Sequence, residues 1–136
     1  MIKEKLDRYV DILNDIPEMQ DKYLWLMQFG KKSEGLVGEL RLKEFEVPGC
    51  QSQTWLVPGY HTNGKLYFSA DSAALISKGM VCLLADIFSG FTGNDIASFE
   101  TKSLDDLKLD TLLTPGRRNG VYSMLKKIQG YGRRAA

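Results

Sequence analysis

Apolar residues recur at helical spacing over the first third of the chain. Residues 2–14 place their apolar positions on one face, which predicts a first helix. A second helix is predicted to start with Asp15 as its cap and Pro17 in its first turn. It is predicted to end near Gly30-Lys31-Lys32, with a helix-stopping glycine and two lysines at its negative end. The predicted buried stripe of this second helix is Ile16, Met19, Tyr23, Leu26 and Met27.

The middle of the chain changes to an alternating pattern. Residues 35–47 suggest extended chain with a short edge strand, and residues 52–57 and 65–70 alternate apolar and polar positions, as strands do. Asn63-Gly64, between the last two runs, is typical of a hairpin turn. We therefore expect a small antiparallel sheet of about three strands.

After the hairpin the pattern is helical again. Asp71 and Ser72 are suited to cap a helix that runs to about Ser89 and is apolar nearly all round, which predicts a central, buried helix. Gly79, in the middle of that helix, is less favourable than alanine by about 1 kcal/mol. A close approach by another element would explain this glycine.

Further helix starts follow. Thr92 with Asp95, and Ser103 with Asp106, resemble capped helix starts, and Thr114-Pro115 opens the last helix. The predicted buried stripe of this last helix is Val121, Met124, Leu125 and Ile128. The order of helices, antiparallel sheet and helices predicts an α+β fold.

Length and composition indicate one domain, residues 1–136, with its own core. The 18 Lys and Arg residues nearly balance the 17 Asp and Glu residues, which argues against nucleic-acid binding. The most apolar stretch, residues 73–88, contains Lys78 and Asp86 and is shorter than the roughly 20 residues that span a membrane. Residues 1–5 lack a signal-peptide core, so we expect a cytoplasmic protein.

Residues with metal or thiol chemistry are few. Two cysteines, Cys50 and Cys82, do not make a disulfide scaffold. Together with His61, the only histidine, they are too few and too scattered for a zinc site. Cys82 falls within the apolar helix, so we expect a buried, inert thiol there. His61 falls in the hairpin turn and is expected to be exposed.

Cys50 is the best candidate for chemistry. It directly follows Pro48-Gly49 and precedes a strand, which places it on a loop. The thiolate is the reactive form of cysteine and the free side chain has a pKa of about 8.5, so a nucleophile needs nearby donors or positive charge. Gln51, Ser52 and Gln53 offer donors. From spacing alone, an unreactive half-buried thiol is an equally good interpretation.

Arg117 and Arg118 stand in the first turn of the last predicted helix. Positive charge is unfavourable at that end by roughly 0.3–1 kcal/mol per residue. A nearby anion, such as a thiolate or a persulfide, would compensate for this. The alternative is that both side chains simply point into solvent.

The ten residues from Val47 to Leu56, VPGCQSQTWL, resemble the active-site segment of the SufE/CsdE family of cysteine desulfuration proteins. Lys22-Tyr23-Leu24, residues 71–79 and residues 113–120 resemble other segments of that family, in the same order along the chain. The resemblance therefore spans nearly the whole chain.

The chain departs from the family pattern at three positions. Thr54 stands where valine is common, a change expected to alter local packing. Gly116 replaces the serine of a Thr-Pro-Ser-Arg motif, and Arg118 has no clear counterpart. Any role of that serine hydroxyl is therefore missing from this chain.

The resemblance implies the α+β fold that SufE shares with U-type iron–sulfur scaffold proteins. It also implies that Cys50 takes sulfur from the persulfide of a cysteine desulfurase, stimulates that enzyme, and passes the sulfur to an iron–sulfur scaffold complex. Gln51, Ser52, Gln53 and Arg117 would support Cys50. The chain would be a sulfur carrier, not an enzyme, and a monomer or weak dimer with no nucleic-acid or membrane partner. It would hold no metal or cofactor of its own, because the pyridoxal phosphate belongs to the desulfurase.

Transfer of sulfur between cysteines needs an exposed thiolate on a mobile loop and no base or metal. Because a persulfide is easily oxidised or reduced, we expect partial shielding as well, with Cys50 resting against apolar side chains in the free protein and swinging out when a partner docks. Three alternatives remain. They are an iron–sulfur scaffold, which needs several thiolates, a cysteine hydrolase with His61 as its base, and a thiol-based redox sensor that uses Cys50 alone or with Cys82.

Overall fold

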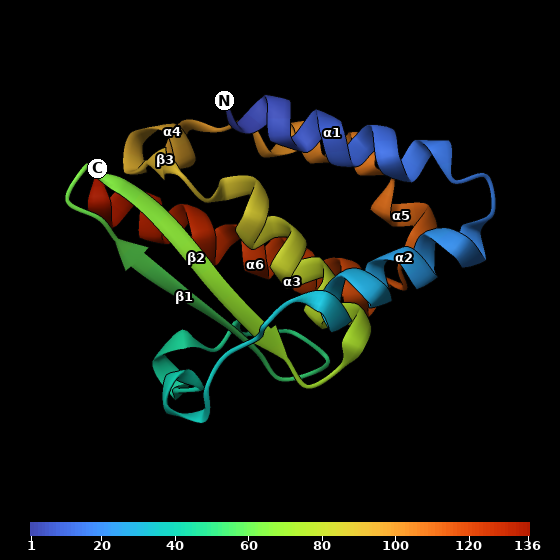
Figure 1. The fold of residues 1–136 in the computed structure, drawn as a ribbon, viewed down its shortest axis with the longest axis horizontal. Helices are drawn as coiled ribbons and strands as arrows, with labels where there is room; N and C mark the ends of the chain where they lie inside the picture. The colour runs from blue at the N-terminus through green and yellow to red at the C-terminus, as the bar shows by residue number, and fades with distance from the viewer.

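A computed structural model describes residues 1–136 and shows a three-stranded antiparallel sheet with helices before and after it (Figure 1). The α-helices are α1 (Ile2–Asp15), α2 (Met19–Lys32), α3 (Leu75–Phe88), α4 (Gly93–Ser98), α5 (Leu109–Leu112) and α6 (Pro115–Ala135). The strands are β1 (Thr54–Tyr60), β2 (Lys65–Ser72) and β3 (Phe91–Thr92). Short 3-10 helices are η1 (Gly38–Leu40), η2 (Lys43–Phe45) and η3 (Thr101–Leu107). The predicted α+β class is confirmed.

The sheet has the strand order β1-β2-β3, and β1 and β2 form the predicted hairpin. Gly64 has a φ of 81°, which glycine adopts without strain, and the Asn63 side chain accepts a hydrogen bond from the Lys65 amide at 3.0 Å. The side chains of Leu66 and Phe68 are buried while Tyr67 is exposed, as the alternation predicts.

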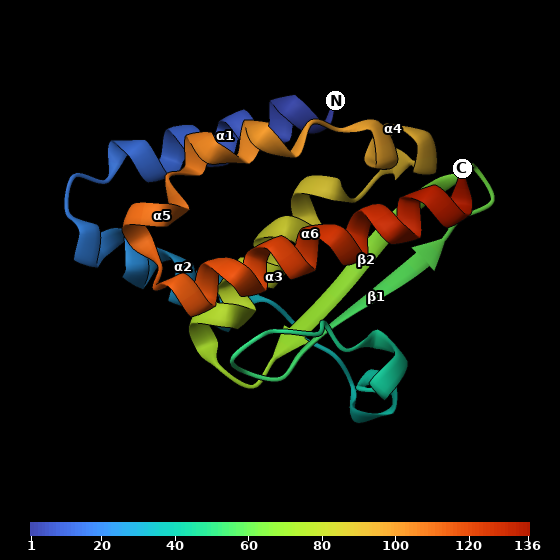
Figure 2. The same ribbon diagram turned by 180° about the vertical axis from the view of Figure 1, so that it is seen from behind.

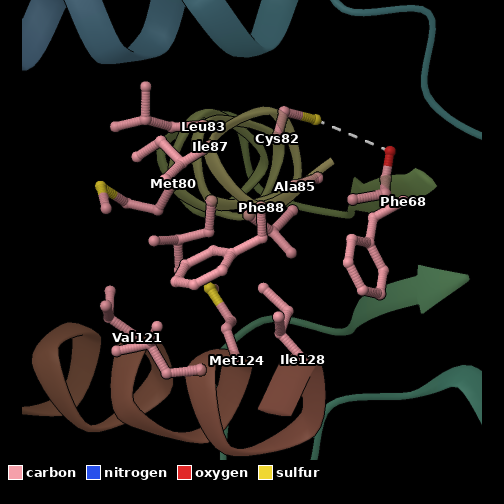
Figure 3. Packing of buried hydrophobic residues seen from close by; sticks show 14 of the residues in the cluster. Phe68, Met80, Cys82, Leu83, Ala85, Ile87, Phe88, Val121, Met124 and Ile128 are labelled. Carbon is pink, nitrogen blue, oxygen red and sulfur yellow. Dashed lines mark hydrogen bonds between the residues drawn. The ribbon is translucent and has the colours of Figure 1, made fainter. Parts of the chain in front are cut away.

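Helix α3 is the centre of the core, as its apolar sequence predicts. Its side chains meet α6 on one side and the sheet on another (Figure 3). The predicted stripe of α6 is buried: Val121, Met124, Leu125 and Ile128. Cys82 is 8% exposed, and its thiol donates to the Ala70 carbonyl at 3.6 Å, so its predicted burial is confirmed. No helix combines the length and the apolar character needed to cross a bilayer.

Helices α2 and α3 cross with their backbones in contact. A Cβ atom on Gly79 would lie 2.0 Å from the Leu26 carbonyl oxygen, and one on Gly30 would lie 2.6 Å from the Gly79 nitrogen. This contact is the close approach that Gly79 indicates. The predicted end of α2 near Gly30-Lys31-Lys32 is confirmed, because the helix ends at Lys32 with both lysines in its last turn. Gly30 itself lies within the helix and is not its stop.

The predicted start of the second helix at Asp15 is wrong. Helix α1 runs through Asp15, and α2 begins only at Met19. Pro17 disfavours helical backbone in the residue before it, and Ile16 is accordingly extended, with φ −85° and ψ 113°. Glu18 is extended too, so helical backbone resumes after it.

The predicted buried stripe of α2 is right only in part. Leu26 is fully buried, and both Leu26 and Gly30 of α2 contact α3. Met19 and Tyr23 are 44% and 38% exposed. The buried face therefore follows the crossing point with α3 rather than the apolar residues of the first turn.

The predicted edge strand in residues 35–47 and the predicted capping role of Asp71 are both wrong, for one reason. Asp71 lies in β2 and is 3% exposed, and its carboxylate accepts from the Leu36 amide at 3.0 Å and from Arg41 Nη2 at 2.6 Å. These bonds hold the segment that contains Leu36 and Arg41, which forms the 3-10 helices η1 and η2 instead of a strand. Glu46 alone pairs with β1, through a single bridge to Trp55. Helix α3 starts without a side-chain cap.

Of the four other predicted helix caps, those at Thr92 and Thr114 are confirmed and those at Ser103 and Ser72 are wrong. The Thr92 hydroxyl accepts from the Asp95 amide at 3.2 Å, and the Thr114 hydroxyl accepts from the Arg117 amide at 3.4 Å, so both are confirmed. Ser103 is not a cap, because η3 starts before it, without a side-chain bond. Ser72 ends β2 instead of capping α3.

Replacing Gly79 with alanine should destabilise the fold, because the added methyl group would collide with backbone atoms of α2 that cannot rotate away. We expect a loss of about 1–3 kcal/mol, as for other overpacked cores, and a melting temperature lower by several degrees. Thermal unfolding followed by circular dichroism measures this.

Gly38→Ala is the matched control, because nothing lies within 4 Å of the position of its added Cβ. Its melting temperature should equal or slightly exceed that of the wild type. Equal melting temperatures for Gly79→Ala and the wild type would show that the two helices do not meet as closely as described.

Candidate functional site

Cys50 lies on the loop that leads into β1, beside the first half of α6 (Figure 2). Gly49 has a φ of 82°, a conformation that favours glycine and turns the chain toward α6. The Cys50 side chain is half-buried against the apolar core, as expected, and its Sγ donates to the Gly120 carbonyl at 3.7 Å. A Cβ atom on Gly120 would lie 3.2 Å from Sγ, so glycine at this position leaves room for the thiol to pack against α6.

The chain after Cys50 is fastened to the end of β2. The Ser72 hydroxyl donates to the Gln53 carbonyl at 2.9 Å, and the Ala73 amide donates to the same oxygen at 2.9 Å. The Thr54 hydroxyl donates to the Ser52 carbonyl at 2.9 Å. The loop is therefore held firmly at its β1 end.

Arg117 joins this loop to two helices. Its Nη1 donates to the Ser52 hydroxyl at 3.0 Å and also to the Ser77 hydroxyl of α3. The first turn of α6 thus places a guanidinium next to the cysteine loop, as the sequence suggested for Arg117. Arg118 faces a different hollow, formed by η3, α5 and α6.

Burial and charge act in opposite directions on the thiol. Burial is the largest influence and raises the pKa of Cys50, while the Thr54 hydroxyl and the Arg117 charge lower it by less. The sheltered side chain is therefore mainly a neutral thiol near pH 7, and movement into a more polar environment would favour the thiolate.

The remaining predicted support residues differ in their surroundings. The Gln51 amide covers the first turn of α6, where a Cβ on Gly116 would lie 2.1 Å from its Nε2. The space of the missing serine side chain is thus occupied by Gln51. The Gln53 side chain turns instead to Glu46, donating to its carboxylate at 3.3 Å. Only Ser52 and Arg117 of the predicted set bond to each other.

Sequence reasoning missed Ser77 and the electrostatic effect of Thr54. Ser77 is the buried polar residue of a helix whose other buried residues are apolar, which is the one signal that could have revealed it. Thr54 was expected to change packing alone, but it also lowers the pKa of Cys50. Both depend on contacts between distant segments.

One side of Cys50 opens on a hollow between η2 and α6, whose lining includes Lys43, Glu46 and Lys127. His61 is exposed in the hairpin turn, as expected, with its ring 4.4 Å from that of Tyr67, and lines a different hollow. The structure holds no group of three or more His, Cys, Asp or Glu side chains placed to bind a metal ion.

Comparison with known proteins gives two results. A family model described as "SufE: Fe-S metabolism associated domain" matches residues 7–132. A solution structure of a hypothetical protein from Thermus thermophilus superposes with a TM-score of 0.79, covering 99% of this chain and 98% of that chain at 19% sequence identity. At this identity the second likeness shows the fold alone.

Arg117→Ala should shift the pH profile of Cys50 alkylation upward, because the Arg117 charge lowers the pKa of the thiol. The plateau rate at high pH should rise, because the loop also loses its bond through Ser52. Iodoacetamide labelling of the Cys50 peptide, followed by mass spectrometry across pH, separates the two effects.

Arg117→Lys keeps the charge but not the forked donor, so its profile should stay closer to the wild-type midpoint while its plateau rises. Arg133→Ala, at the exposed far end of α6, should change neither quantity. An unchanged midpoint in Arg117→Ala would mean that the guanidinium does not act on the thiol.

Proposed function

Because this chain belongs to the SufE family of domains associated with Fe–S metabolism, we propose that it carries sulfur on Cys50. The donor would be the persulfide of a pyridoxal-phosphate-dependent cysteine desulfurase, which the chain would stimulate by removing its product. The recipient would be an iron–sulfur cluster assembly complex. The observation that supports this best is a half-buried thiol on a loop, tied to an arginine, in the segment VPGCQSQ.

The proposed transfer is an exchange at sulfur. The Cys50 thiolate attacks the terminal sulfur of the donor persulfide, R–S–SH, and a new S–S bond forms. The original S–S bond breaks, and the donor cysteine leaves as a thiolate, R–S⁻. Cys50 then carries the persulfide, Cys–S–SH, with no net oxidation or reduction. A thiolate of the recipient removes the terminal sulfur from Cys50 by the same kind of step.

Shelter of Cys50 suits a carrier that must avoid wasteful reactions. In the free protein, burial raises the pKa of the thiol, so it reacts slowly with small oxidants and electrophiles. Docking would draw the loop outward, break the contact with Gly120 and expose Cys50 to the donor. Arg117 would then balance negative charge at the sulfur.

A scaffold function is less well supported. Clusters need several thiolate ligands, whereas Cys50 is the one cysteine at this site and the Cys82 thiol is directed to the Ala70 carbonyl within the core. A redox sensor that forms a disulfide between Cys50 and Cys82 is also less well supported, because Cys82 is buried in the core.

Incubation with a cysteine desulfurase and L-cysteine should add the mass of one sulfur atom to the Cys50 peptide. Mass spectrometry without reductant detects it, and dithiothreitol should remove it, because thiols attack persulfides. Cys50→Ser should show no gain, while Cys82→Ser should gain sulfur like the wild type. No gain on Cys50 with several desulfurases would refute the proposal.

Docking should also accelerate alkylation of Cys50, because the thiol leaves its apolar surroundings. We expect at least a severalfold higher iodoacetamide rate with saturating desulfurase and no L-cysteine, measured on the Cys50 peptide. Labelling of Cys82 is the internal control and should not change. Slower or unchanged labelling of Cys50 would mean that the loop stays closed in the complex.

A further inference from the structure

A second hollow lies on the face of α6 turned away from Cys50, beneath η3 and α5. Five of its eight lining residues are hydrophobic, and its volume is about 310 Å³. Ligand pockets run from roughly 300 to 1,000 Å³, so this hollow suits a small molecule rather than a large one.

Arg118 is the unusual residue of this hollow. Its Nε is buried and has no hydrogen-bond partner, and its guanidinium forms no ion pair within the chain. A buried donor without an acceptor is unfavourable. Because the guanidinium presents its donors as a planar fork, the acceptors that fit it best are carboxylates and phosphates.

Asp105 and Asp110 line the same hollow, are exposed, and have no salt bridge with Arg118 or with any lysine. Two carboxylates oppose a simple anion but attract a cation. The hollow thus combines a free guanidinium, two free carboxylates and apolar walls that include Leu104 and Leu125.

We propose that this hollow binds a zwitterionic α-amino acid with an apolar side chain. The carboxylate of the ligand would meet Arg118, its ammonium group would face Asp105 and Asp110, and its side chain would pack on Leu104 and Leu125. This hollow shares no lining residue with the hollow beside Cys50, so a test of amino-acid binding here does not depend on whether the protein carries sulfur.

Titration of the ¹⁵N-labelled protein with L-leucine, followed by NMR, tests the site. We expect saturable shifts of amides in residues 104–125, with N-acetyl-L-leucine and L-leucinamide each binding more weakly because one charge is missing. Arg118→Gln should weaken leucine binding at least about tenfold, the loss expected for a charged hydrogen bond. Arg133→Gln, the same change on an exposed arginine of α6, should bind like the wild type.

No saturation at millimolar leucine would overturn the proposal, as would equal affinities for leucine and N-acetyl-L-leucine. Inorganic phosphate binding as tightly as leucine would mean a general anion site and would also overturn it. Arg118→Gln should melt at or above the wild-type temperature, because it removes an unpaired, half-buried charge. Should that variant not fold, the comparison of leucine with its two derivatives on the wild type decides the question.

Discussion

Helix α3 is apolar nearly all round, and the need to bury it on every side organises the rest of the molecule. Helix α2 covers it through direct backbone contact at Gly79, the sheet covers a second side and α6 a third (Figures 1 and 3). Its one buried polar exception, Ser77, meets Arg117. The packing that forms the core therefore also fixes the guanidinium beside the cysteine loop.

The chemistry of Cys50 depends on a balance between shelter and charge. Burial disfavours the thiolate, and the Arg117 charge favours it without overcoming burial. A surface thiol would be reactive at all times, and a thiol as deeply buried as Cys82 would be inert. The half-buried position next to Gly120 lies between these extremes, and on the proposed function the reactivity of Cys50 would rise when the loop moves.

The sequence predicts best what is decided locally. The Asn63-Gly64 turn, the Thr114 cap and the apolar α3 depend on neighbouring residues, and all three are confirmed. Asp71 could not be assigned in this way, because two of its partners, Leu36 and Arg41, lie 35 and 30 residues earlier in the chain. For the candidate site, the loop position of Cys50 could be predicted, and Arg117 could be suggested, but the bonds that join them through Ser52 required the fold.

The end of β2 limits how the cysteine loop can open. After Cys50, the chain is anchored at Gln53, whose carbonyl accepts from the Ser72 hydroxyl. Before Cys50, it is anchored at Val47, whose amide donates to the Thr54 carbonyl at 2.8 Å. Only residues 48–52 lie between these two anchors, so an opening that preserves the sheet must be confined to them. Within that stretch the polar contacts to be broken are those of Cys50 with α6 and of Ser52 with Arg117 and Thr54. On the proposed function, a motion this small would free the Cys50 thiol while the core around α3 stays intact, as repeated docking to partners would require.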